Sequence, residues 1–131
     1  QFLSQVKLAP TGVDEQSGLL LTNPDGQMAT VMLSMHSKQP KRGMVSCEKG
    51  YIEVMEYPRA CEATIIYTES GEREVIKAGE TSEALIYEVL DMERAIQENT
   101  DVMCLSYTQN VMEMMTNFRN EWGLKYPEEM E

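Results

Sequence analysis

A hydrolytic or metal site would most readily be built around histidine, and the chain has one, His36. Ser34 and Ser37 lie beside it, so a serine nucleophile activated by an imidazole is the chemistry to consider. These residues belong to a segment with the alternation of a β-strand, in which residues two apart simply share a face. We therefore interpret His36 as an ordinary strand or interface histidine, and we predict no catalytic and no metal-binding residue here.

An acid and a base of suitable types stand next to each other at Tyr87 and Glu88. The surrounding sequence has helical spacing, and adjacent helical residues point about 100° apart. The two side chains therefore do not converge easily on one compact site. We expect Tyr87 to pack against the protein and Glu88 to be solvated.

Motifs that bind phosphate or zinc are missing: the chain has no G-x-G-x-x-G, no phosphate loop and no H-E-x-x-H. Cys47, Cys61 and Cys104 are odd in number and widely spaced, which favours buried free thiols over disulfides or a metal knuckle. The 11 methionines are dispersed, which favours adaptable core packing over a copper site. We predict that this chain contains no cofactor-binding residue.

Composition predicts a single globular domain, because 131 residues with 42% hydrophobic and 25% charged side chains suffice for one core. A net charge of -11 disfavours nucleic acid and anionic membranes as partners. No apolar run approaches the roughly 18 residues of a membrane span, and the N-terminus lacks the layout of a signal peptide. We expect a cytoplasmic protein.

The elements that would position these residues are strands first and helices afterwards. Alternation and turn residues predict about seven mostly antiparallel strands, with a tight reversal at Asn23–Gly26. The expected strands are residues 2–8, 16–22, 27–37, 42–47, 51–57, 60–68 and 73–77.

Helical spacing begins beyond Gly79. Thr81 or Ser82 can cap a first helix that ends at Asn99, and Ser106 can cap a second that ends before Gly123. The pattern predicts an α+β fold: an open-faced, mostly antiparallel sheet with two C-terminal helices packed on one face, all in one domain over residues 1–131. The last helix is expected to be anchored on the sheet by Phe118 and Trp122, and an exposed acidic tail is expected at Pro127, Glu128, Glu129 and Glu131.

The sheet face opposite the helices is predicted to bind a partner. Alternation over residues 27–37 places one set of side chains toward the helices, namely Ala29, Val31, Leu33 and Met35. The outward set then includes Met28, Met32 and His36, which is too apolar for a purely solvated surface. We predict self-association through this face.

The order of the segments resembles the C-terminal domain of the glucose-fructose oxidoreductase, inositol dehydrogenase and rhizopine-catabolism family. The resemblance covers residues 14–128 and rests on the order and spacing of its segments. They are the hairpin around Asn23–Ala29, the hairpin Cys47–Ile52, the helix Tyr87–Ile96, the last helix Tyr107–Trp122 and the closing Gly123–Pro127. Cys47 replaces the first glycine of the family's second hairpin.

In such enzymes an N-terminal Rossmann domain binds NAD or NADP, while the C-terminal α+β domain contributes to the substrate pocket and the oligomer interface. The resemblance implies that the parent is an NAD(P)-dependent oxidoreductase acting on a sugar, polyol or dihydrodiol, with its Rossmann domain outside this chain. The family's catalytic Glu-Lys-Pro belongs to that other half, whereas the local Glu48-Lys49 is followed by Gly50.

By this interpretation the chain alone is inactive and binds no nicotinamide cofactor. The alternative is a free-standing binding or assembly module without enzymatic activity. A third hypothesis, a small independent hydrolase, lacks a nucleophile and base that could be assembled from these residues.

Overall fold

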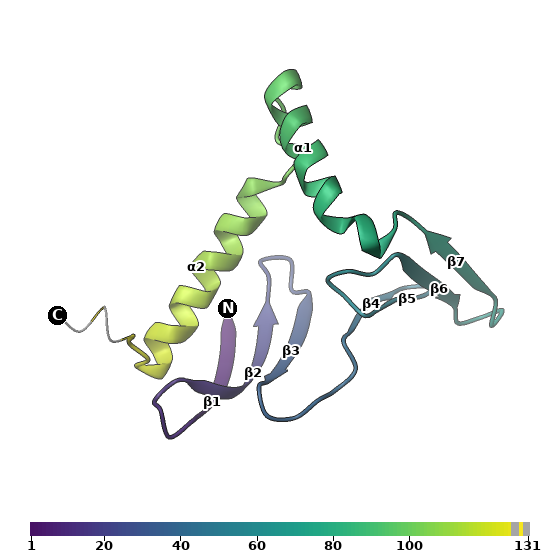
Figure 1. The fold of residues 1–131 in the computed structure, drawn as a ribbon. Coiled ribbons are helices and arrows are strands. Elements are labelled where there is room, and N and C mark those ends of the chain that lie inside the picture. Colours follow the sequence, from purple (N-terminus) through teal and green to yellow (C-terminus); the bar gives the residue numbers. More distant parts are fainter. Residues whose placement is uncertain (127–128, 130–131) are drawn as a thin grey trace. The chain divides into compact units, whose positions relative to one another are not determined.

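The computed structural model describes residues 1–126 and Glu129. Seven strands, one short 3-10 helix and two α-helices follow one another in these residues (Figure 1). The chain divides into two compact units. Unit 1 comprises residues 1–38 and the described part of 104–131, and unit 2 comprises residues 39–103.

Unit 1 contains an antiparallel sheet in the order β1-β2-β3, with β1 at Phe2–Leu8, β2 at Asp14–Thr22 and β3 at Met28–Ser34. The reversal between β2 and β3 lies where the sequence predicts it. Asn23 N donates to Gln27 O at 3.0 Å, and Asn23 Oδ1 accepts from Gln27 N at 2.8 Å. Gly26 supplies the positive φ, +81°, that this turn requires.

Helix α2, Leu105–Trp122, packs on β1 within unit 1. The ring of Phe118 is buried and meets Phe2 edge-to-face, with 4.7 Å between ring centroids. Trp122 Nε1 donates to Ser4 Oγ at 2.8 Å. The expectation that Phe118 and Trp122 anchor the last helix is confirmed, although Trp122 is only partly buried.

Helix α2 ends where the sequence predicts but begins at a different residue. Gly123 takes the left-handed conformation, φ +66°, and its N–H bonds to the last carbonyls of the helix, as the sequence predicts. The helix begins at Leu105 with Cys104 at the cap position, so the expected cap at Ser106 is wrong by two residues. Arg119, in the last turn of α2, donates hydrogen bonds to both carboxylate oxygens of Glu129, which lies beyond the helix. These bonds lower the pKa of the Glu129 carboxyl.

Strand register assigns the faces of the unit 1 sheet. Phe2 pairs with Leu21, and Leu21 pairs with Ala29, so these residues share the face on which α2 lies. Because alternate residues point to opposite faces, Met28 and Met32 lie on the other face, as predicted.

His36 is not part of that outward strand face. The ladder of β3 ends at Ser34, which pairs with Gln16, and His36 lies in the bend that follows. The expected strand over residues 27–37 is therefore too long at its C-terminal end. Met35 keeps one backbone bond, from its N to Glu15 O at 2.9 Å, but lies beyond the strand.

Unit 2 contains an antiparallel sheet in the order β4-β5-β6-β7. Its strands are Arg42–Cys47, Gly50–Met55, Glu62–Tyr67 and Arg73–Lys77. The two-residue turn Glu48-Lys49 joins β4 to β5. One face of this sheet is apolar, because the register aligns Val45, Ile52 and Ile65 across three strands.

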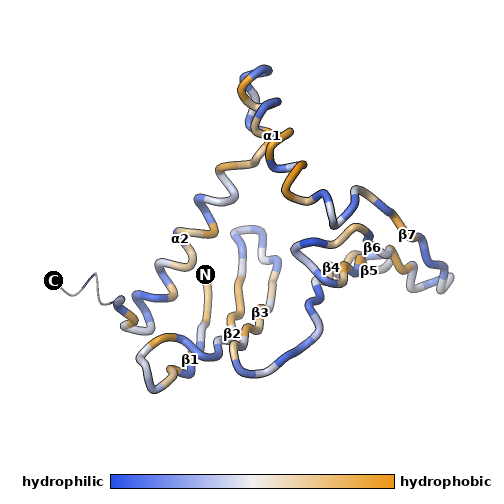
Figure 2. Tube along the Cα trace, in the orientation of Figure 1, coloured by the Kyte–Doolittle hydropathy of each residue, from blue (hydrophilic) through white to orange (hydrophobic). Residues whose placement is uncertain are grey.

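A 3-10 turn η1, Thr81–Glu83, leads from β7 into helix α1, Ala84–Glu98. Asn99 ends the helix in the left-handed conformation, as predicted. Apolar and polar residues recur along α1 at helical intervals (Figure 2). Among the residues of unit 2, α1 contacts η1 but no strand, and it contains no buried residue. Within residues 1–126 and Glu129, neither helix is long and apolar enough to cross a bilayer.

The α+β class with antiparallel strands is confirmed, but the strands form two sheets instead of one, and only α2 packs on strands of its unit. Residues 35–41, which separate β3 from β4, include Pro40, whose nitrogen cannot donate to a ladder. The expected acidic tail at Pro127, Glu128 and Glu131 lies outside the described residues. The assignment of residues 1–131 to one domain stays a prediction.

Candidate functional site

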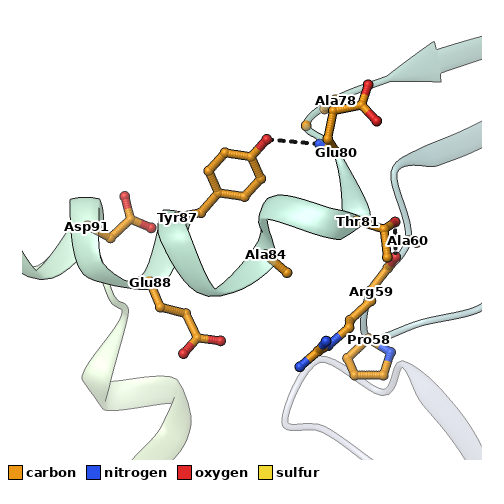
Figure 3. A pocket seen from close by; sticks show the side chains of 11 residues that line it. Pro58, Arg59, Ala60, Ala78, Glu80, Thr81, Ala84, Tyr87, Glu88 and Asp91 are labelled. Atoms are coloured by element: carbon orange, nitrogen blue, oxygen red, sulfur yellow. Dashed lines mark hydrogen bonds between the residues drawn. The ribbon is translucent and has the colours of Figure 1, made fainter.

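A cleft of about 720 Å³ lies in unit 2 where α1 begins. Its walls come from the loop after β5, the residues after β7 and the first turns of α1 (Figure 3). The polar side chains that line it are Arg59, Glu80, Thr81, Tyr87, Glu88 and Asp91. Arg59 is the cation of this lining, and the three carboxylates give the cleft a net negative charge.

Local hydrogen bonds hold the start of α1 against the loops. Thr81 Oγ1 donates to Arg59 O at 2.8 Å. The hydroxyl of Tyr87 accepts from Glu80 N at 2.9 Å and donates to Glu83 Oε2 at 3.2 Å (Figure 3). Tyr87 therefore works as a cap for the residues that precede the helix, which leaves its hydroxyl already engaged.

The acid and base suggested by the sequence at Tyr87 and Glu88 do not converge. Figure 3 shows the two side chains extending from different sides of α1. Glu88 makes no hydrogen bond to Tyr87 and lines the cleft with Arg59, which is not within ion-pair distance of it. The arrangement offers a guanidinium donor and carboxylate acceptors to a polar ligand, but no paired acid and base.

Arg59 and Asp91 are cleft residues that the sequence analysis did not select. Arg59 follows Pro58 in a loop, and Asp91 lies one helical turn beyond Tyr87. Nothing in the local sequence distinguishes either residue from other surface charges. Only the contact between the loop and the helix brings them together.

The serines near the histidine form a structural hydrogen-bond cluster. Ser37 Oγ donates to Ser34 Oγ at 2.7 Å, and Ser37 N donates to the same oxygen at 3.1 Å. Gln16 Nε2 donates to Ser34 Oγ at 3.3 Å. The cluster ties the bend after β3 to the sheet without the imidazole of His36. Within the described residues, no three His, Cys, Asp or Glu side chains lie close enough together to hold a metal ion.

All three cysteines are exposed free thiols, so the prediction that they are buried is wrong. Cys47 ends an edge strand, Cys61 precedes β6 and Cys104 caps α2, which are positions at the ends of elements and not in their packed centres. We expect 5,5′-dithiobis(2-nitrobenzoate) to titrate three thiols per chain without denaturant. A thiol that reacts only after guanidinium is added would contradict the exposure of that residue.

The open face of the unit 1 sheet is the second candidate site. Met28 and Met32, with exposed fractions of 65% and 66%, lie there with Leu3 and Leu20. Gly18 faces the same way, and a Cβ at that position would lie 3.1 Å from Met32 Sδ. The glycine therefore gives the thioether of Met32 room to lie over β2, which places an apolar group at the centre of the face.

Comparison of the chain with protein-family models finds no matching family. A search of curated proteins likewise finds no match. The geometry of the two candidate sites, together with the order of the elements, is the basis for the function proposed below.

Proposed function

We propose that this chain is the C-terminal half of a cytoplasmic NAD(P)-dependent oxidoreductase acting on a sugar, polyol or dihydrodiol. Its role is to form part of the substrate pocket and to hold subunits together, while the nicotinamide site and the catalytic lysine belong to another part of the parent protein. The observation that carries the proposal is the division of the unit 1 sheet into one face packed by α2 and one open, apolar face.

An apolar sheet face of this kind favours a subunit interface over a solvated surface. Large exposed side chains gather there around Met32, and small polar residues such as Thr30 lie between them. Two copies of the face related by a twofold axis would bury each other's methionines. Methionine suits such a contact because its flexible thioether adapts to an opposing surface.

Three of the segments on which the family resemblance rests form the kind of element that it implies. The β2–β3 hairpin turns at Asn23–Gly26, residues 87–96 lie within α1, and residues 107–122 lie within α2, which is followed by Gly123. These elements support the proposal only by their type and order along the chain. The cleft beside α1 adds a chemical argument, because a guanidinium and carboxylates in its lining suit the hydroxyl groups of a sugar or diol.

The experiment compares this chain with the protein encoded by the complete reading frame. Calorimetric titration of this chain with NADH and NADPH should show no saturable binding at sub-millimolar concentrations. The complete protein should reduce NAD⁺ or NADP⁺ in the presence of a polyol, sugar or dihydrodiol. In that protein, Arg59→Ala should raise the KM for the hydroxylated substrate about tenfold, the size expected for one lost charged hydrogen bond.

The free-standing assembly module is the competing function, and the same assays separate the two. A module would leave the complete protein without dehydrogenase activity on every substrate of these classes. Micromolar binding of NADH by this chain alone would also contradict the proposal, because it would show that the cofactor site lies in this chain.

A further inference from the structure

Helix α1 has an apolar seam that unit 2 leaves uncovered. The seam consists of Leu85, Val89, Met92 and Ile96, which follow one another at intervals of four, three and four residues. This is the spacing by which one helix packs along another. Their exposed fractions range from 49% at Met92 to 74% at Ile96. Such a continuous exposed stripe is typical of a binding surface.

Two carboxylates border the seam, Glu88 on one side and Glu93 on the other. At 100° per residue, each lies about 70° from the centre of the seam. Among the described residues neither forms an ion pair. The one cation of the helix, Arg94, lies on the far side, where it is bound to Glu98 at 3.1 Å. The two charged residues that border the seam are therefore both acidic, and on the side of Glu93 the exposed apolar surface continues through Ile86 and Leu90.

The acidic border extends into the cleft at the start of α1. Glu88 borders the seam and also lines the cleft, whose lining includes two further acidic residues, Glu80 and Asp91; Figure 3 shows these two extending to the other side of the helix from Glu88. Among the described residues that line this cleft, Arg59 is the only cation. A positively charged side chain beside the seam at this end would meet the carboxylate of Glu88.

We propose that α1 is a docking site for a basic amphipathic helix. The apolar side chains of that helix pack along the seam, and lysines or arginines on its flanks pair with Glu88 and Glu93. Burial of the seam supplies affinity, and the two carboxylates select the charge of the partner. The surface is separate from the open face of the unit 1 sheet, and the proposal does not rest on the proposed oxidoreductase function.

A second copy of this chain fits the seam less well than a basic partner. In a parallel pair of α1 helices, Glu88 of one copy would face Glu93 of the other on both sides of the seam. In an antiparallel pair neither border would gain a cation, because Arg94 lies on the far side of the helix. The net charge of -11 adds a general repulsion between copies.

The test uses fluorescence anisotropy with two labelled synthetic peptides of about 18 residues, long enough for several helical turns. Both have leucine and isoleucine along one stripe, and they differ only in having lysine or glutamate at the flanking positions. The lysine peptide should bind this chain, and the glutamate peptide should bind at least about tenfold more weakly. Equal binding of the two peptides would overturn the charge selection.

Variants locate the site on α1. Val89→Glu should weaken binding of the lysine peptide at least about tenfold, whereas Val111→Glu, a matched change at an exposed position of α2, should leave it unchanged. The double variant Glu88→Lys, Glu93→Lys should reverse the preference and bind the glutamate peptide. This second variant keeps the proposal testable if Val89→Glu loses helix content by circular dichroism.

Thiol labelling separates a foreign partner from other occupants of the seam. In Val89→Cys, residue 89 should react with a maleimide in the free protein and be protected by the lysine peptide, as located by mass spectrometry. Protection in the free protein that persists at high dilution would mean that this chain itself covers the seam. Protection that appears only at high protein concentration would identify a second copy as the occupant, and either result would overturn the proposal.

Discussion

Replacing Gly50 by alanine is expected to disrupt the unit 2 sheet more than the same replacement at any other glycine of that unit. A Cβ at this position would lie 2.0 Å from the carbonyl oxygen of Ile66, an atom of the neighbouring strand that belongs to the backbone. The strands must therefore move apart where Ile66 is buried. We expect Gly50→Ala to cost about 3 kcal/mol or more of stability, at the upper end of overpacking substitutions.

The control is Gly43→Ala on β4 of the same sheet. A Cβ there meets only Tyr57 Cδ1, at 4.0 Å, which is an ordinary contact. We expect that variant to remain within about 1 kcal/mol of the wild type. Amide hydrogen exchange should then show lost protection in β5 and β6 of Gly50→Ala alone. Wild-type protection there in Gly50→Ala would show that the two strands do not approach as closely as described.

Phe118→Ala should cost about 3 to 5 kcal/mol, the usual range for removing a buried aromatic ring. Phe118 is 6% exposed and contacts the rings of both Phe2 and Trp122, at 4.7 and 6.2 Å between centroids. Trp122 is the only tryptophan, so its fluorescence in a guanidinium titration reports on unit 1. Because Trp122 is only partly buried, the larger effect is expected at Phe118 and not at Trp122.

Tyr107→Ala provides the comparison, because this ring lies on the same helix and is 69% exposed. It should change stability by no more than about 0.5 kcal/mol. If Phe118→Ala were equally mild, α2 would not be anchored on β1 through that ring, and the assignment of the covered sheet face would have to be revised.

Local signals in the sequence were sufficient for the elements and for the C-terminal ends of both helices. They were not sufficient for the helix starts, where Glu83 and Cys104 occupy the cap positions instead of Thr81 or Ser82 and Ser106. Asn23–Gly26 predicts the β2–β3 turn because its proline and glycine supply the required dihedrals, and Asn99 and Gly123 end helices because both tolerate a left-handed conformation. Alternation in residues 28–34 also assigned Met28 and Met32 to the face opposite α2, since a strand has a strict period of two.

Packing between elements could not be predicted in the same way. Helical spacing shows that α1 has an apolar stripe, but it does not say whether a sheet of the same unit covers that stripe. Whether another segment covers Cys47 cannot be read from the residues around it, and within the described residues none does. The position of Arg59 beside α1 likewise depends on how the loop after β5 packs against a later segment. The length of β3 was overestimated because the alternation continues past Ser34 into a bend held by side-chain hydrogen bonds.

We propose that the open face of the unit 1 sheet joins subunits, and sedimentation velocity of this chain can detect that association. The wild type should associate at micromolar concentration or above. Met32→Glu should yield a folded monomer, because it places like charges on both sides of the proposed interface. Met112→Glu, the same change at a comparably exposed position on α2, should leave the oligomer intact. A wild type that remains monomeric at high concentration, or an oligomer that survives Met32→Glu, would show that this face is not a subunit interface.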